Sequence, residues 1–312
     1  TLVNAFDMPA RQAFVVQMVE DRRDLSNAIA LNSSMVNAAR LVGPALAGLI
    51  IAGAGEGDCF LLDGASYLTV IVSLLAMRIP VRAGRQGGKR VLHELVEGWK
   101  YVAGSVPIRS ILLLLALVSL VGMPYTVLMP VFASQVLHGG PHTLGFLMAA
   151  VGVGALASAA LLAGRRSVLG LGRMIPISAG IFGAALIAFC ASRVFWLSML
   201  LLLGTGFGFL QQMAASNTIL QTIVAEEKRG RVMAYYAMAF QGVAPFGSLL
   251  AGALAAKIGA PKTLAGGGVL CLLGALWFAR QLPEIRRRVR PIYAEMGILP
   301  EPASTVEISP ED

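Results

Sequence analysis

The sequence predicts an all-α polytopic membrane protein. Apolar residues make up 56% of the 312 residues and charged residues only 13%, whereas a soluble domain carries about 25% charged residues. The mean hydropathy is +0.73. Stretches such as Ile111–Ala133 and Phe195–Phe209 are nearly uncharged, and about 20 apolar residues span the hydrocarbon core of a bilayer. Apolar residues therefore occur along the whole chain, and the core of a single soluble domain could not bury all of them.

The expected helices follow one another as apolar runs, separated by charged or Gly- and Pro-rich breaks. Residues 1–19 have the pattern of the last half of one helix. Eight complete spans are predicted after it, at 28–54, 60–79, 109–134, 143–164, 174–191, 194–222, 232–257 and 263–281. Because the chain opens inside a helical pattern, without an initiator Met or a signal peptide, we expect further helices upstream in a longer, N-terminally truncated parent.

Lysine and arginine are distributed unequally between alternate connections. One set of connections and helix ends holds 20 of these residues and the other set holds only three, Arg193, Lys257 and Lys262. Because basic connections stay in the cytoplasm, the first set and the C-terminus are predicted to be cytoplasmic. The basic residues behind the net charge of +8 are thus distributed over the connections between spans and do not form one basic face. We therefore expect no nucleic-acid partner.

Four parts are expected along the chain. Residues 1–79 form a front group of helices, and residues 109–282 form a six-helix transmembrane bundle. The cytoplasmic linker 80–108 between them is basic and carries an amphipathic helix on the membrane surface, because apolar residues recur at helical spacing from Val91 to Val102. Residues 283–312 are predicted to be a disordered cytoplasmic tail.

A weak internal repeat relates the front and back of the chain. The segment from Met8 to Arg23 resembles the segment from Met213 to Lys228, and each is followed by an apolar helix with a central proline, Pro44 or Pro245. Parallel repeats of six helices are typical of many secondary transporters. Chance similarity between apolar sequences remains the alternative.

Three motifs in the first 48 residues carry a family resemblance. They are Asn4–Phe14 (NAFDMPARQAF), Asn27–Asn32 (NAIALN) and Asn37–Gly48 (NAARLVGPALAG). On these motifs the chain resembles the major facilitator superfamily, and within it the bacterial exporters similar to the enterobactin exporter. The resemblance implies two helical bundles with twelve helices in all. Residues 1–19 would then end helix four, and the eight spans would be helices five to twelve.

The same resemblance implies a role for Gly43, Pro44 and Gly48 in helix five. In such exporters a glycine–proline motif at this place is associated with antiport. The residues themselves also indicate mobility, without the resemblance. Pro44 removes a backbone hydrogen bond, and the two glycines allow close contact with another helix, so the segment is able to bend or rock. Ordinary tight packing is the alternative.

Charged residues inside the predicted spans are candidates for coupling, because such residues are costly in a membrane. Asp7 and Arg40 lie at matching depths of about 18–20 Å on consecutive antiparallel helices, at 1.5 Å per residue. Arg11 follows Asp7 by one turn. We expect a cluster of Asp7, Arg11 and Arg40, either as a structural ion-pair network or as part of the coupling path. Asp63 is the other candidate, either as a proton carrier with a raised pKa or as a water-facing residue of a vestibule.

Uncharged polar residues in the spans mark a predicted cavity, because amides that face lipid without a partner are unfavourable. The alternative for each is a hydrogen bond between helices. The candidates are Asn32, Asn37, Gln211, Gln212, Asn217 and Gln241.

Other patterns exclude classes of function. The sequence shows no paired spacing for metal ligands, no nucleophile with a base and no Walker-type phosphate loop, so we expect no enzyme and no cofactor. The Gly-rich stretch 152–157 lies within a span, so it predicts close helix packing and not a dinucleotide site.

The resulting expectation is a proton-coupled secondary active transporter of the bacterial inner membrane, monomeric when full length. It would export a small amphipathic molecule, drug- or siderophore-like, by alternating access. Uptake or lysophospholipid translocation by the same fold is the alternative within transport. A polytopic membrane enzyme or a scaffold is the alternative of another class.

Overall fold

The computed structural model describes residues 53–76, 88–165 and 167–295, together with positions 35, 39, 46, 47 and 50. All regular elements of this described part are helices. Seven of its helices are long and apolar enough to cross a membrane. The predicted all-α polytopic class is therefore confirmed.

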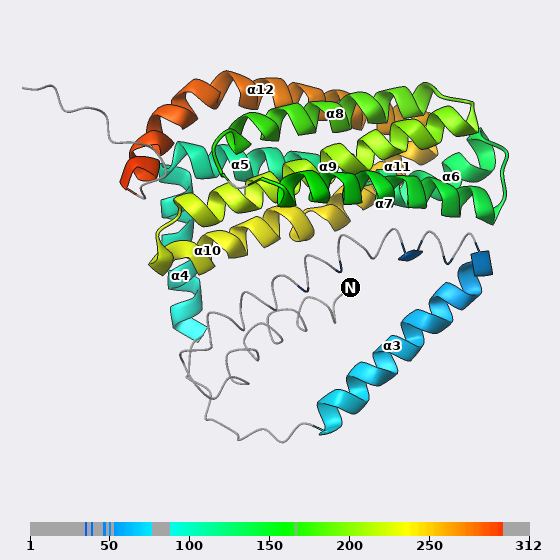
Figure 1. Ribbon diagram of the computed structural model, residues 1–312, viewed down its shortest axis with the longest axis horizontal. Helices are drawn as coiled ribbons and strands as arrows, with labels where there is room; N and C mark the ends of the chain where they lie inside the picture. The colour runs from blue at the N-terminus through cyan, green and yellow to red at the C-terminus, as the bar shows by residue number, and fades with distance from the viewer. Residues whose placement is uncertain are drawn as a thin grey trace, which may run out of the picture.

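Six membrane-length segments pack side by side in one bundle (Figure 1). Two of them are composite, with short π-helical segments between α-helices. The elements are α5 (Val106–Leu117), η1 (Val118–Gly122), α6 (Tyr125–Val131), η2 (Phe132–Val136), α7 (Pro141–Ala163), α8 (Leu171–Ala191), α9 (Phe195–Ile223), α10 (Glu226–Ala237), η3 (Met238–Gly242), α11 (Ala244–Ile258) and α12 (Ala260–Glu295). The starts and ends of the spans predicted over 109–257 agree with these helices within a few residues, apart from the start of α10.

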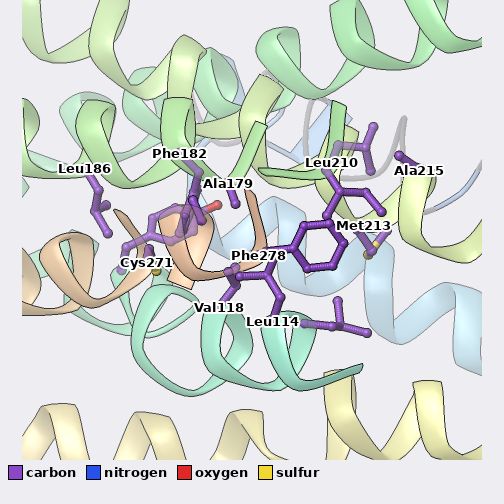
Figure 2. Packing of buried hydrophobic residues seen from close by; sticks show 14 of the residues in the cluster. Leu114, Val118, Ala179, Phe182, Leu186, Leu210, Met213, Ala215, Cys271 and Phe278 are labelled. Carbon is purple, nitrogen blue, oxygen red and sulfur yellow. The ribbon is translucent and has the colours of Figure 1, made fainter. Parts of the chain in front are cut away.

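The helix α9 packs between α7 and α8, and α8 also packs on α12. In turn α12 packs on α5, η1 and α11. Figure 2 shows Phe278 of α12 in the resulting core, near Leu114 and Val118 of α5–η1 and Met213 of α9. All four side chains are buried. The bundle is thus held by interdigitated apolar side chains, the main source of helix association where lipid is as apolar as the protein.

Glycines set the distance between α7 and α9. A Cβ atom at Gly154 would come closer than 3.0 Å to the backbone of Leu203, and one at Gly206 would come closer than 3.0 Å to the backbone of Val151. The two helices therefore touch backbone to backbone. This confirms that the Gly-rich stretch 152–157 serves close helix packing.

The amphipathic segment expected in the linker is the helix α4 (Gly88–Gly104). It runs across one end of the bundle at a steep angle to the bundle helices (Figure 1). We call this end, which also carries the α7–α8 connection, the start of α10 and the last turns of α12, the basic end. Glu97 of α4 forms an ion pair of 2.5 Å with Arg231 of α10. The rings of Trp99 and Tyr235 lie 6.0 Å apart, so α4 is attached to α10.

The last helix is longer than predicted. The expected span ended at residue 281 and the disordered tail began at 283, but α12 continues through Pro283 and Pro291 to Glu295. Its outer turns are stabilised by Glu284, whose carboxylate pairs with Arg287 at 2.9 Å and Arg288 at 2.6 Å. Ile285 and Val289 are buried on the other face. These contacts outweigh the single backbone hydrogen bond that each proline removes, so the boundary at 282 is corrected.

The helix α3 (Glu56–Ala76) stands apart from the bundle in Figure 1. It corresponds to the span predicted at 60–79. None of its described side chains is buried by the described part of the chain. Its exposed apolar residues, Phe60, Leu68 and Leu75 among them, therefore face either lipid or residues outside the described ranges.

Candidate functional site: polar positions and helix breaks inside the bundle

The middle and second half of α9 carry a group of buried polar side chains. Gln211, Gln212 and Ser216 are each 0% exposed. They occur on an otherwise apolar membrane-spanning helix, where a polar group without a partner costs free energy. The predicted polar positions Gln211 and Gln212 therefore lie in the interior of the bundle.

Gln211 is paired. Its Oε1 accepts a hydrogen bond of 2.7 Å from the hydroxyl of Ser158 on α7, and its Nε2 lies 3.8 Å from the sulfur of Met174 on α8. The side chain thus links the three helices α7, α8 and α9. Of the two roles expected for Gln211, lining a cavity or forming a hydrogen bond between helices, the structure shows the hydrogen bond.

Gln212 has no such partner in the described part of the chain. Within residues 53–76, 88–165 and 167–295, its Nε2 and Oε1 are buried without a hydrogen-bond partner, and so is the hydroxyl of Ser216. The two residues are four apart, which places them on one face of α9. A buried amide in this state costs about 1–3 kcal/mol of stability. Such a cost is commonly associated with a functional position.

The other described polar candidates lie nearer the surface. Asn217 is half-buried and accepts a hydrogen bond from Gln221. Gln241 is exposed and belongs to η3. Asn32 and Asn37 lie outside the described residues.

Two membrane spans are broken at matching places. The π-helical segments η1 and η3 each lie shortly before a proline, Pro124 or Pro245. Proline has no N–H, so the carbonyls of Leu120 and Gln241 lose their usual α-helical partners, four residues on. Helices tend to kink at such positions, and π-helical segments are frequent at functional sites.

The two π-helical segments, η1 and η3, are in contact. The hydroxyl of Ser119 in η1 donates a hydrogen bond to the carbonyl of Phe240 in η3. The backbone of η1 is also pressed against two glycines, because a Cβ atom at Gly247 or at Gly267 would come closer than 3.0 Å to it. Thus η1 lies between α11 and α12 with almost no spare room.

A row of aromatic rings runs past this contact. The ring of Phe209 on α9 lies 5.7 Å from that of Phe182 on α8 and 6.0 Å from that of Phe240. Tyr125, the first residue of α6, lies 6.2 Å from Phe182 in an edge-to-face arrangement. Phe182 and Tyr125 are buried, so these rings pack α6, α8 and α9 together in the core of the bundle.

The predicted charged positions lie apart from this region or outside the described part. Asp63 is exposed on α3, so the alternative of a water-facing residue stays open beside that of a proton carrier. Asp7, Arg11, Arg40, Gly43, Pro44 and Gly48 all fall outside the described residues, and their roles remain predictions.

The six-helix bundle has no acidic residue of its own in its spans. Residues 98–225 and 228–283 contain neither Asp nor Glu. These two ranges therefore offer no carboxylate as a proton carrier. The connection from η2 into α7 lies at the end of the bundle opposite the basic end (Figure 1), and His138 and His142 lie in or next to this connection.

Reasoning from the sequence missed Ser119, Phe240 and Ser158. A signal for the first two was present, since glycine precedes proline closely in both spans, as Gly122-Met123-Pro124 and as Gly242 to Pro245. Such pairs mark helix breaks. No pattern in the sequence around Ser158 indicated a role for it, because its hydrogen bond is to Gln211 on another helix, α9.

Membrane-length helices, broken spans that touch and the amide of Gln212, buried without a partner among the described residues, are typical of one class, the multi-pass helical membrane transporters. Comparison with known proteins supplies the family. Over residues 1–304 the chain matches the family model described as "Transmembrane secretion effector", and it belongs to this family of the major facilitator superfamily. The resemblance seen in the sequence motifs is thereby confirmed at the level of the superfamily.

Two curated relatives are each 25% identical to this chain over the aligned residues. The Staphyloferrin A transporter of Staphylococcus aureus is 25% identical over 292 residues, which cover 91% of this chain and 71% of the relative. The MFS-type transporter YfmI of Bacillus subtilis is 25% identical over 297 residues, covering 92% of this chain and 71% of the relative.

A solved structure shares the fold. It is a bacterial homologue of the human lysosomal transporter Spinster, in an inward-facing and unoccupied conformation. The match has a TM-score of 0.55 and 16% sequence identity, and it covers 85% of this chain and 72% of that one. At this identity it supports the fold alone.

Proposed function

We propose that this protein exports a small amphipathic, siderophore-like molecule by alternating access, with protons as the counter-ion. The observation that carries the proposal is the contact between the two broken spans, η1 and η3, in a bundle that also buries the amide of Gln212 without a partner among the described residues. Membership of a transporter family sets the class of activity. The direction, the coupling ion and the substrate class are the proposed parts.

Alternating access needs an element with two arrangements. A π-helical segment followed by proline bends more easily than an intact α-helix, because backbone hydrogen bonds are already missing there. Since η1 and η3 are joined by the hydrogen bond from Ser119 to Phe240, a bend in one span is transmitted to the other. Their tight glycine contacts favour discrete arrangements over a continuous slide.

The substrate class is inferred from both the site and a relative. An amphipathic molecule suits a bundle in which Phe209 of α9 lies about one helical turn from the buried amide of Gln212 and 6.0 Å from the ring of Phe240. A relative named as a Staphyloferrin A transporter makes a siderophore-like compound the first to test.

Proton coupling is assigned to the front part of the chain. Because the spans of the six-helix bundle have no carboxylate, Asp7 and Asp63 are the proposed proton carriers. Arg11 and Arg40 are proposed to hold the Asp7 carboxylate charged until a proton arrives. Gly43, Pro44 and Gly48 would supply the rocking helix.

The proposed orientation places the basic end and the C-terminus in the cytoplasm, in the bacterial inner membrane. The 20-to-three distribution of Lys and Arg supports it. We propose that the full-length protein works as a monomer.

The test uses the full-length protein in everted vesicles, with staphyloferrin A as the first compound offered. Export coupled to protons predicts accumulation that collapses when the proton gradient is dissipated, and that the Asp7→Asn variant loses. Asp58→Asn is the matched control, since Asp58 is an exposed residue at the start of α3. Accumulation in right-side-out vesicles instead would establish uptake, and full gradient-driven export by Asp7→Asn would rule out the assigned coupling role of Asp7.

A further inference from the structure

A cavity of about 920 Å³ lies at the basic end of the bundle. It is enclosed by the last turns of α12, by the connection into α8 and by the side of α9 at Ile219. None of the polar positions described above lines it. It is therefore separate from the broken spans and from the polar group on α9.

Arginines surround this cavity. Arg173 of α8 and Arg286, Arg287 and Arg290 of α12 all line it. Arg287 is paired with Glu284. The other three are exposed and make no hydrogen bond or ion pair with the described part of the chain. Three uncompensated guanidinium groups at one cavity create a site for an anion, and the planar fork of arginine suits phosphate especially.

The inner wall of the cavity is apolar. Ile219, Ile285 and Val289 are 4–6% exposed and line it together with Leu282. A free inorganic anion gains nothing from such a wall, because apolar surface attracts only apolar groups. The combination of arginines at the rim and aliphatic side chains within fits an amphiphile with an anionic head.

One edge of the cavity, at Arg173, begins an apolar stripe on α8. Arg173, Ile177 and Ile181 follow each other at intervals of four residues, which keeps them on roughly one helix face. Ile177 is 59% exposed and Ile181 is 39% exposed. These isoleucines are left uncovered by the described residues and offer an apolar surface that suits an acyl chain, and a lipid lying along them would have its head beside Arg173.

The cavity also lies at headgroup depth. The 36 residues of α12 make a helix of about 54 Å at 1.5 Å per residue, whereas the hydrocarbon core is about 30 Å thick. Counted from Ala260, the hydrocarbon crossing ends near Arg280. The cavity-lining part of α12, residues 282–294, therefore lies in the headgroup layer.

We infer that this cavity binds an anionic phospholipid, with its phosphate between Arg286 and Arg290 and an acyl chain along the exposed face of α8. Arg173 closes the site on the α8 side. The site is independent of the transported molecule, and it stands even if the proposed substrate or direction is wrong.

The competing occupant is the acidic segment 296–312, which contains four carboxylates and no basic residue. It matches the charge of the arginines. It does not explain why the cavity adjoins the apolar stripe on α8, whereas a phospholipid explains both features. The lipid is therefore the occupant that the geometry favours.

The test measures lipid retention by the full chain in detergent, using native mass spectrometry. Dioleoylphosphatidylglycerol and dioleoylphosphatidylcholine are offered at equal concentrations. The wild type is expected to retain one phosphatidylglycerol in preference. Arg286→Gln with Arg290→Gln should weaken that binding about 30-fold, from roughly fivefold per arginine near a membrane surface. The control, Arg193→Gln with Arg288→Gln, removes two charges outside the cavity and should leave the preference intact.

Four results would overturn the inference. The first is an absence of preference in the wild type, and the second is an equal loss in the two double variants, which would mean general surface charge. The third is displacement of phosphatidylglycerol by inorganic phosphate at equal concentration, which would mean a site for the anion alone. The fourth is a preference seen only after deletion of residues 296–312, which would mean that the chain's own acidic segment fills the cavity. Equal melting temperatures of the two double variants verify that both are folded.

Discussion

At the scale of single residues, Gln211 and Gln212 are chemically identical neighbours on α9 with opposite surroundings. Gln211 is oriented by Ser158 and Met174, and its amide holds three helices together. Gln212 is equally buried, yet its amide has no partner among the residues that the structure describes. Evolution toward stability alone would replace such an amide with a hydrocarbon side chain. We therefore propose that Gln211 serves the fold and that Gln212 serves function.

The matched variants Gln211→Leu and Gln212→Leu test this assignment. Gln211→Leu leaves the buried hydroxyl of Ser158 without its partner, so we expect a loss of about 1–3 kcal/mol in the free energy of unfolding. Gln212→Leu removes two unsatisfied atoms and should instead stabilise the protein by about 1–2 kcal/mol while lowering the transport rate. Melting temperatures of the purified proteins and vesicle transport give the two readouts. If both variants are destabilised alike, the amide of Gln212 has a partner after all.

At the scale of elements, the break at η1 is held by its neighbours. The backbone of this segment meets Gly247 of α11 and Gly267 of α12 with no room for a methyl group. The contact with η3 adds one hydrogen bond, from Ser119. In addition α10, which precedes η3 in the same span, is attached to α4 through Glu97 and Arg231. Movement of the linker helix is thereby linked mechanically to the broken spans.

Gly247→Ala tests the role of this close contact. The new Cβ atom would come closer than 3.0 Å to the carbonyl of Leu120, and backbone cannot yield as a flexible side chain does. We expect destabilisation by about 1–3 kcal/mol and a strong loss of transport. Gly252→Ala, on the same helix, is the control, because a Cβ atom there meets nothing within 4 Å. Equal melting temperatures of the two variants would contradict the tight packing of η1.

At the scale of the whole molecule, the ends of the bundle differ in charge. The basic end carries α4, the connection into α8 and the outer turns of α12, while Arg193 lies at the opposite end. The proposed topology turns the basic end toward the cytoplasm. Both the lipid cavity and the linker helix would then lie on the inner side of the membrane.

Cysteine labelling in intact cells measures this orientation. In a variant without Cys59, Ser167→Cys in the α7–α8 connection should react with a membrane-impermeant maleimide only in everted vesicles. His138→Cys, at the opposite end, should react in intact cells. The buried Cys190 and Cys271 should contribute little background. The reversed pattern would invert the topology and with it the meaning of export.

The number, order and approximate limits of the described spans were predictable from the sequence alone, as was the amphipathic helix α4. The physical reason is that bilayer thickness imposes the length of an apolar run, and helical periodicity imposes the spacing of an amphipathic face. Both are local properties. Each can be read without knowing which helix packs against which. The class of protein followed from them.

Only the tertiary structure decided which polar residues are paired, where the broken spans meet and how far α12 extends. Ser158 and Gln211 are 53 residues apart, and Ser119 and Phe240 are 121 apart, so no local pattern relates them. Arg173 and Arg290 likewise share a cavity only because α12 folds against the start of α8. The length and position of a membrane span are determined by the bilayer around that helix, whereas a site depends on contacts between helices that are distant in the sequence.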